Sequence, residues 1–302
     1  MQAYQIAVDS CFMPELPEVE TIARGLARRV TGDGIESVWL AAKPQFLKSP
    51  ASQIVDTLTS RRIARIHRIG KHIVFDLEIE GLASSQPKQS LATKLKPQHG
   101  PAPRAQWIVH LGMTGRLQVC SPEAEVAKHT HAILRLASGR ELRFVDPRRF
   151  GRLSVSPRGE FDTGGQEPLE IEPERFVSLF KGRKTPVKSA LLNQKLLRGV
   201  GNIYADESLF RAGIRPQRHA ATLTHEQLKK LHVSLKKVLR EAIALGGSSI
   251  SDYVDAEGEE GFFQLKHRVY GREGEPCLKC KTPVRRVVIA GRSSHYCPRC
   301  QK

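Results

Sequence analysis

The sequence predicts an α+β protein with a strand-rich N-terminal part, a helical C-terminal part and a small cysteine-rich module at its end. Residues 73–145 contain short runs of alternating or continuous apolar side chains, which are typical of β-strands. From residue 175 onward the apolar residues follow helical spacing. Residues 277–300 hold two Cys-x-x-Cys pairs, which predict a metal-binding module.

Each predicted element follows from a local pattern. Residues 16–30 carry apolar side chains at helical spacing, and Pro17 suits the first turn of a helix. Residues 83–106 contain four basic residues and no acid and are rich in Ser, Gln and Pro, so we expect a flexible, solvated insertion. Its four basic residues leave contact with a polyanionic backbone as the alternative. Strands are expected at 73–79, 107–111, 132–136 and 141–145.

Composition shifts suggest where the domains begin and end. The Gly-, Pro- and Glu-rich residues 156–174 predict a linker between an N-terminal domain, 13–155, and a helical domain, 175–265. Thr224 and Gln227 form a capping-box signature, and the helix that they open should stop at Gly246 and Gly247. The cysteine module is expected to occupy residues 266–302.

The charge of the chain predicts a polyanionic partner. There are 48 Lys and Arg against 31 Asp and Glu, a net charge of +17, and such an excess most often indicates nucleic acid. The excess is concentrated at residues 266–302, which carry ten basic and two acidic residues. The sequence contains no apolar run long enough to span a membrane, and residues 1–12 lack the features of a secretory signal.

The C-terminal cysteines match the spacing of a structural zinc site. Cys277 and Cys280 form one pair and Cys297 and Cys300 the other, with sixteen residues between the pairs. Four thiolates leave no open coordination position, so one structural zinc ion is expected, with a rubredoxin-like iron site as the alternative. The residues between the pairs suit a β-hairpin whose tip carries Arg292.

A glycine turn precedes a predicted helix in the middle of the C-terminal part. Gly199-Val200-Gly201 is followed by Asn202, a natural N-cap for a helix that begins at Ile203. The free N–H groups of that first turn form an anion site, and in a protein this basic the expected anion is a DNA phosphate. A nucleotide-binding turn is excluded because no strand precedes the glycines and no third glycine follows them.

The most informative motif is Met13-Pro14-Glu15-Leu16-Pro17-Glu18-Val19-Glu20-Thr21. If translation begins at Met13 and the methionine is removed, Pro14 becomes an N-terminal secondary amine, which can attack a sugar carbon and form an iminium ion. Within a longer chain the same nitrogen is an inert amide. We therefore expect that Met1 is a misassigned start and that residues 1–12 are absent from the working protein.

Several motifs in order resemble the formamidopyrimidine-DNA glycosylase family. They are MPELPEVET, GKHIVFDL, HLGMTGRL, DPRRFG, GVGNIYADESLF and the C-terminal cysteine module, and they extend from Met13 to Lys302. The resemblance implies an N-terminal β-sandwich with flanking helices, a helix-two-turns-helix domain and a zinc-finger β-hairpin. It implies a bifunctional DNA glycosylase and AP lyase that removes 8-oxoguanine and formamidopyrimidines and cuts the strand by β,δ-elimination.

The resemblance also implies roles for individual residues. Pro14 matches the nucleophile, Glu15 a general acid and Lys71 a second catalytic lysine, while Glu18 shapes the pocket and Arg292 serves DNA binding and late elimination. Met113, Arg148 and Phe150 match the side chains that fill the duplex after base flipping. Phosphate contacts are implied for His129, Lys184, Lys188 and Asn202. Many relatives carry Lys where Ser251 stands, so the lesion preference is left open.

Two other functions are compatible with the sequence. The protein is a catalytically silent DNA-lesion-binding protein if residues 1–12 stay attached to Pro14. An endonuclease VIII-like enzyme for oxidised pyrimidines is disfavoured by Leu16 and Phe150. The expected partner is double-stranded DNA with oxidised bases, bound by a monomer in the bacterial cytoplasm and associated with the nucleoid.

The start of the chain can be tested directly. An α-amine has a pKa of about 8 in model peptides, so part of a terminal Pro14 is unprotonated near neutral pH. We expect intact-mass analysis of the native, active protein to give a chain that begins at Pro14. An active species that retains residues 1–12 would disprove both the start site and the proline mechanism.

Overall fold

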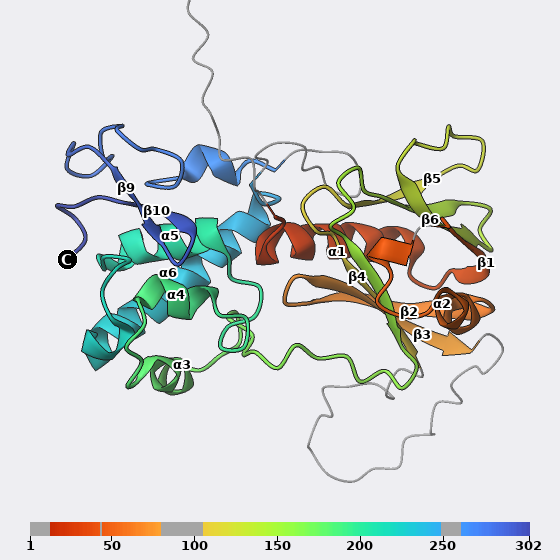
Figure 1. Cartoon of the computed structure of the whole chain (residues 1–302), viewed down its shortest axis with the longest axis horizontal. Helices are drawn as coiled ribbons and strands as arrows, with labels where there is room; N and C mark the ends of the chain where they lie inside the picture. The colour runs from red at the N-terminus through yellow and green to blue at the C-terminus, as the bar shows by residue number, and fades with distance from the viewer. Residues whose placement is uncertain (1–12, 43, 80–104, 249–260) are drawn as a thin grey trace, which may run out of the picture. The chain divides into compact units, whose positions relative to one another are not determined.

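The computed structural model describes residues 13–42, 44–79, 105–248 and 261–302, which form two compact units (Figure 1). One unit contains residues up to Ile22, Ile69–Lys71 and Asp162–Lys302, and the other contains Ala23–Arg68 and His72–Phe161. The long helix α1, Leu16–Val30, has the predicted bounds, and its first turns belong to the helical unit. These two units are defined by contacts in space. The domain boundaries expected from composition are a separate division of the sequence and stay predictions.

The sheet unit is built on one antiparallel sheet of eight strands, in the order β5-β7-β6-β1-β2-β3-β4-β8. Its two halves are joined where β1 pairs with β2 through only two residue pairs, Gly34 with Arg62 and Ile35 with Arg61. The strands are β1 Gly34–Leu40, β2 Arg61–Ile69, β3 His72–Ile79, β4 Ala105–His110, β5 Arg116–Cys120, β6 Thr130–Leu136, β7 Glu141–Val145 and β8 Arg152–Ser156.

The two halves of the sheet face each other across the core of this unit. Phe46, in the short helix η1 Pro44–Phe46, stacks on His131 of β6, while Leu47 forms a bridge with Leu153 of β8. The ring of Phe144 on β7 lies close to Gly151 at the start of β8. Helix α2, Ala51–Leu58, packs against β1, β4 and β8. The fold of this unit is therefore the expected sandwich, closed from a single sheet.

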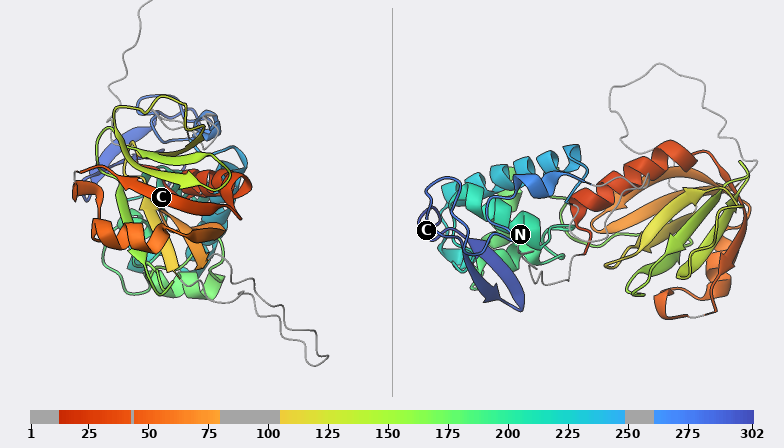
Figure 2. Two further views of the ribbon diagram at one scale, coloured as in Figure 1. Left: turned by 90° about the vertical axis from the view of Figure 1, so that its right-hand side faces the viewer. Right: turned by 90° about the horizontal axis from the view of Figure 1, so that it is seen from above.

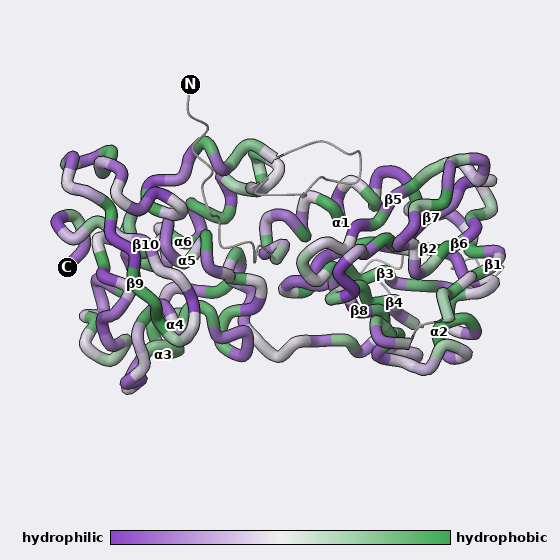
Figure 3. The backbone as a smooth tube through the Cα atoms, turned by 45° about the horizontal axis from the view of Figure 1, so that its top comes forward, coloured by the Kyte–Doolittle hydropathy of each residue, from purple (hydrophilic) through white to green (hydrophobic). Residues whose placement is uncertain are grey.

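Burial within the sheet differs from the predicted alternation. Strand β3 is buried at five consecutive positions from Ile73 to Leu77, because both of its faces are covered, and Figure 3 shows the hydrophobic colour along β3 and β4. The predicted end of the insertion at residue 106 is wrong, because Ala105 and Gln106 already belong to β4 and pair with β3. Residues 80–104 lie outside the described part.

The helical unit packs its helices around one apolar core, which also takes in Leu16 of α1. Helix α6 begins directly after Thr224, and its capping box with Gln227 is formed as predicted. Gly246 and Gly247 follow α6 with positive φ angles. The helices are α3 Pro173–Phe180, α4 Val187–Leu192, α5 Asn202–Ala212 and α6 His225–Ala244, with the short turns η2 Ala220–Thr222 and η3 Phe263–Lys266.

The cysteine module ends the chain as a hairpin beside α5, seen in Figures 1 and 2. Strands β9, Arg285–Ile289, and β10, Arg292–Tyr296, form the predicted β-hairpin with Arg292 paired to Ile289, and Ala290 and Gly291 form the turn with positive φ angles. The buried carboxylate of Glu207 on α5 accepts N–H groups of residues 268–270. In the described part of the chain, none of the helices has the length and apolar character that crossing a membrane requires.

Candidate active site and nucleic-acid interface

The predicted catalytic motif lies at the start of α1, inside the helical unit. Pro14 and Glu15 are buried, and the N–H of Leu16 donates to the carbonyl of Gly199 at 3.0 Å. Gly201 has no room for a side chain, because a Cβ there would lie only 2.1 Å from Cδ of Glu15. The glycine turn therefore serves to bring the Glu15 carboxyl against the backbone of α5.

The first turn of α5 is occupied by this carboxyl group. Oε1 of Glu15 accepts the N–H of Ile203 at 3.3 Å, so a protein side chain holds the end of the helix where we expected a DNA phosphate. The expected N-cap role of Asn202 is also wrong: Gly201 is the N-cap, and Asn202 is the first helical residue. Oδ1 of Asn202 is buried and has no hydrogen-bond partner within the described chain.

The surroundings of Glu15 favour its neutral form. Burial raises the pKa of Glu15 to about 7, an effect opposed by Lys71 and the N–H groups of α5 and reinforced by Glu18. Oε2 of Glu15 is buried without a hydrogen-bond partner among the residues described. A protonated carboxyl in this position can act as an acid towards a group that binds beside it.

Lys71 comes from the turn between β2 and β3, and Ile69–Lys71 belong to the same unit as Glu15. Gly70 has a φ of +61°, and its carbonyl approaches Gly199 closely. Burial lowers the pKa of Lys71, the carboxylates of Glu15 and Glu18 oppose that shift, and Arg292 adds to it. The structure thus brings Glu15, Glu18, Lys71 and Arg292 into one electrostatic group.

Glu18 joins this group of charged residues to the segment after α6. The carboxylate accepts the N–H of Glu15 at 2.9 Å, the N–H of Ser248 at 2.8 Å and the hydroxyl of Tyr204. Burial raises the pKa of Glu18, and the Tyr204 hydroxyl and these backbone donors oppose the shift. Tyr204 and Ser248 were not expected at this site, since no local sequence pattern links them to Glu18. Ser251 lies outside the described residues.

A second group of predicted site residues lies in the sheet unit. Arg148 and Phe150 are exposed, and the guanidinium of Arg148 lies 5.2 Å from the centre of the Phe150 ring. Met113 is half-buried in the turn between β4 and β5. A Cβ on Gly112, which has a φ of +66°, would lie 2.5 Å from the backbone of Phe150. The two turns that carry Met113, Arg148 and Phe150 therefore touch.

Asp146 fixes this pair of turns, and the sequence analysis did not identify it. It is fully buried; its Oδ1 accepts the Thr114 hydroxyl at 2.6 Å and its Oδ2 the N–H of Gly151 at 2.7 Å. One carboxylate thus connects the turn of Met113 with the turn of Arg148. The only sequence signal was the position of Asp146 directly after a strand and before two arginines.

The basic residues expected to contact phosphate fall into two classes. Lys184 and Arg292 are exposed, and His129 is half-buried in the loop before β6. Lys188 is different: its ammonium group is fully buried, 2.7 Å from Oδ1 of Asp206 and 2.6 Å from the carbonyl of Ser293. A side chain enclosed in this way is not presented to DNA, so the expected phosphate contact of Lys188 is wrong.

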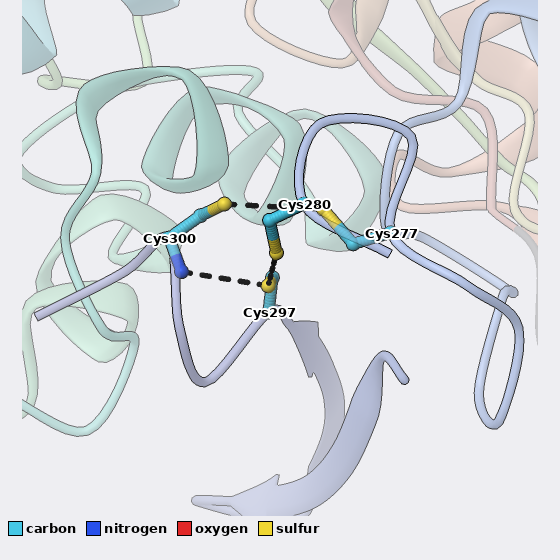
Figure 4. A group of neighbouring side chains, drawn as sticks. All are labelled: Cys277, Cys280, Cys297 and Cys300. Carbon is cyan, nitrogen blue, oxygen red and sulfur yellow. Dashed lines mark hydrogen bonds between the residues drawn. The ribbon is translucent and has the colours of Figure 1, made fainter. Parts of the chain in front are cut away.

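The four C-terminal cysteines form a compact cluster (Figure 4). Their sulfur atoms all lie within 4.8 Å of one another, with 4.0 Å between Cys277 and Cys300 and 3.4 Å between Cys280 and Cys297. Tetrahedral zinc with bonds of about 2.3 Å places its sulfurs about 3.8 Å apart. The donor set and its spacing fit one structural zinc ion.

Three family models match successive parts of this chain. The formamidopyrimidine-DNA glycosylase N-terminal domain matches residues 13–153, the H2TH domain of the same protein 165–254, and a zinc finger found in FPG and IleRS 274–302. A formamidopyrimidine-DNA glycosylase from Solibacter usitatus is 46% identical, covering 96% of this chain and 100% of the relative. The chain belongs to the formamidopyrimidine-DNA glycosylase family.

Solved structures of this family share the fold. The MutM (Fpg) protein of Thermus thermophilus is 40% identical, covers 95% of this chain and 98% of its own, and has a TM-score of 0.78. A Lactococcus lactis Fpg variant in complex with DNA containing Fapy-dG is 31% identical, covers 96% of this chain and 100% of its own, and has a TM-score of 0.81. The sandwich, helical domain and cysteine hairpin are thus those of the formamidopyrimidine-DNA glycosylase family.

The zinc module of this glycosylase-family protein gives one prediction. Replacing Cys297 with Ser removes a buried ligand from a module with little apolar core, so we expect zinc loss, local unfolding and loss of DNA binding. The sheet unit should stay folded. Metal analysis, hydrogen exchange and DNA titration measure these effects. Cys120→Ser on β5 is the matched control, and active wild-type protein without zinc would contradict the prediction.

The raised pKa of Glu15 gives a second prediction. Because the folded pKa of about 7 exceeds the ordinary glutamate pKa of 4.5, the folded protein loses stability as the pH rises between these values. Glu15→Gln keeps the neutral form, so its free energy of unfolding at pH 8 should exceed that of the wild type by up to roughly 3 kcal/mol. The difference should disappear near pH 4.

Chemical denaturation at both pH values measures this difference. Glu36→Gln, at an exposed position on β1, is the control for loss of a surface carboxylate. A Glu15→Gln protein that is less stable than the wild type at pH 8 would show that the ionised carboxyl stabilises the fold.

Proposed function

We propose that this protein is a bifunctional DNA glycosylase and AP lyase that removes oxidised purines and formamidopyrimidines from double-stranded DNA. The observation that carries the proposal is the Glu15 carboxyl, which is next to Pro14 and buried, and whose pKa burial raises to about 7, so that a substantial fraction is protonated at neutral pH. Its unpartnered Oε2 and the nearby Lys71 add an acid and a cation to the same pocket. Relatives solved with Fapy-dG and 8-oxo-G DNA support the choice of substrate.

The proposed reaction begins with Pro14 as a free secondary amine. Its nitrogen lone pair forms a bond to C1′ of the damaged nucleotide while the bond from C1′ to the base breaks, and the amine loses its N–H proton. Glu15 supplies a proton to the leaving base or to the sugar oxygen O4′. The bond from C1′ to O4′ then breaks, O4′ leaves as a hydroxyl group, and the nitrogen lone pair forms the double bond to C1′. The resulting iminium ion acidifies C2′. Loss of a C2′ proton and then a C4′ proton expels the 3′ and 5′ phosphates in turn, which gives β- and δ-elimination.

The remaining residues support this chemistry by their positions. Glu18, held by Tyr204 and Ser248, shapes the pocket, and Lys71 is suited to binding a phosphate beside the lesion. The exposed Arg148 and Phe150 and the half-buried Met113 lie on adjoining turns, and together they suit the space left by a flipped nucleotide. Lys184, His129, Asn202 and Arg292 are proposed DNA contacts. The monomeric state and the location in the cytoplasm stay predictions.

Covalent trapping tests the proposal. A protein that begins at Pro14 and one that retains residues 1–12 are each mixed with an 8-oxoguanine duplex and sodium borohydride. We expect a covalent protein–DNA adduct only with the first, because only a free amine forms a reducible iminium ion. In a protein with Pro14→Gly, the terminal amine of the glycine should still form some covalent adduct. A protein whose Pro14 nitrogen is acetylated should form none.

Each outcome distinguishes one alternative. No adduct and no base release from the protein beginning at Pro14, despite tight binding of the duplex, would support the silent DNA-binding function. Faster release of thymine glycol than of 8-oxoguanine would support the endonuclease VIII-like function. An adduct of equal yield with residues 1–12 attached would exclude Pro14 as the nucleophile.

A further inference from the structure

The buried ion pair of Lys188 and Asp206 connects three separate segments of the helical unit. Lys188 lies on α4, Asp206 on α5, and the carbonyl that also accepts from Lys188 belongs to Ser293 on β10. Both charged side chains are fully shielded from solvent. The pair therefore ties two core helices to the second strand of the cysteine hairpin.

Asp206 holds the same strand through its other oxygen. Oδ2 of Asp206 accepts the N–H of His295 at 2.8 Å, so the strand is bound at Ser293 by Lys188 and at His295 by Asp206. Arg292 directly precedes Ser293 and is the first residue of β10. Its backbone is thus fixed from one side by the ion pair and from the other by the turn at Ala290 and Gly291.

Stability alone gives little reason for such a pair. Taking two charges out of water costs several kcal/mol, and well-packed apolar residues in their place are often as stable or more so. The pair does, however, fix the positions of neighbouring groups, since a buried ammonium group and a buried carboxylate each require hydrogen-bond partners at defined positions. Here those partners are backbone groups of β10, which carries Arg292.

Charged residues of the proposed active site interact electrostatically with Lys188 of this pair. Burial lowers the pKa of Lys188, Asp206 and Glu15 oppose the shift, and Arg292 adds to it. Arg292 also lowers the pKa of Lys71. Arg292 is therefore electrostatically coupled to both lysines, one that belongs to the proposed pocket and one that holds its strand.

We propose that Lys188 and Asp206 are positioning residues for Arg292, fixing strand β10 so that the guanidinium group meets the DNA beside Lys71. The inference rests on the proposed function, because it assigns Arg292 to DNA binding and late elimination. Neither Lys188 nor Asp206 touches the substrate, so their effect on the reaction passes entirely through Arg292. Loss of either side chain should therefore resemble loss of Arg292.

Three variants with a shared control test this proposal on the zinc-loaded full protein. Lys188→Met removes the ammonium group at similar length, Asp206→Asn keeps the shape but removes the charge, and Lys188→Arg restores a cation. Lys230→Met, at an exposed position on α6, is the control for loss of a lysine charge. Each variant is also made together with Arg292→Ala.

The measurements separate positioning from folding. Zinc per chain and hydrogen exchange of β9 and β10 report the hairpin, while duplex affinity and the ratio of β- to δ-elimination products report Arg292. We expect Lys188→Met and Asp206→Asn to keep zinc and to lower affinity and δ-elimination by roughly 10- to 100-fold, the effect of a small misplacement. Lys188→Arg should recover part of the loss, and Lys230→Met should behave as wild type.

The combined variants decide the question. With Arg292→Ala already present, Lys188→Met should have little further effect, since both changes act on the same side chain. Multiplicative losses, wild-type behaviour of Lys188→Met and Asp206→Asn, or loss of zinc in both would overturn the inference. A wild-type protein without base release would instead defeat the proposed function, so the two failures are distinguishable.

Discussion

The site depends on one buried carboxyl group, that of Glu15, placed against the first turn of α5. The two are 188 residues apart in sequence, and their contact holds the beginning of α1 within the helical unit. Helix N-termini attract negative charge and offer free N–H donors. Gly201 makes the approach possible because any side chain there would occupy the space of the carboxyl group.

The same contact sets the chemistry of the pocket. The N–H donors of α5 and Lys71 favour the carboxylate, but desolvation outweighs them, so the pKa of Glu15 comes to rest near 7. Glu18, three residues later, meets the Tyr204 hydroxyl and two backbone N–H groups and takes part in fixing the segment at Ser248. The surroundings thus give two neighbouring acids different roles: Glu15 has a carboxyl oxygen available to a ligand, and Glu18 is held in hydrogen bonds within the protein.

Buried polar groups play a similar part elsewhere in the protein. Asp146 joins the two turns that present Met113, Arg148 and Phe150, and Glu207 gathers the N–H groups at the entry to the cysteine module. Lys188 and Asp206 hold the far strand of the hairpin. In each case a buried charged side chain on a regular element, or directly after one, fixes a loop or strand, which is how rigid elements position functional residues.

The sequence by itself determined the elements whose signals are local. The bounds of α1, the capping box of α6 and the cysteine hairpin followed from spacing within a few residues, and the motif order indicated the family. Strands β1, β2, β5 and β8 were missed. Strand β2, for example, contains four arginines, and only pairing with its neighbours makes it a strand.

Only the tertiary structure decided which charges face solvent and which are enclosed. The sequence shows Lys184 and Lys188 as equivalent basic residues, yet one is exposed and the other is buried against Asp206. It shows Asn202 as a helix cap, yet Gly201 is the N-cap and the distant Glu15 side chain accepts the N–H of Ile203. Burial and long-range pairing depend on how distant segments pack, and local sequence patterns carry no record of that packing.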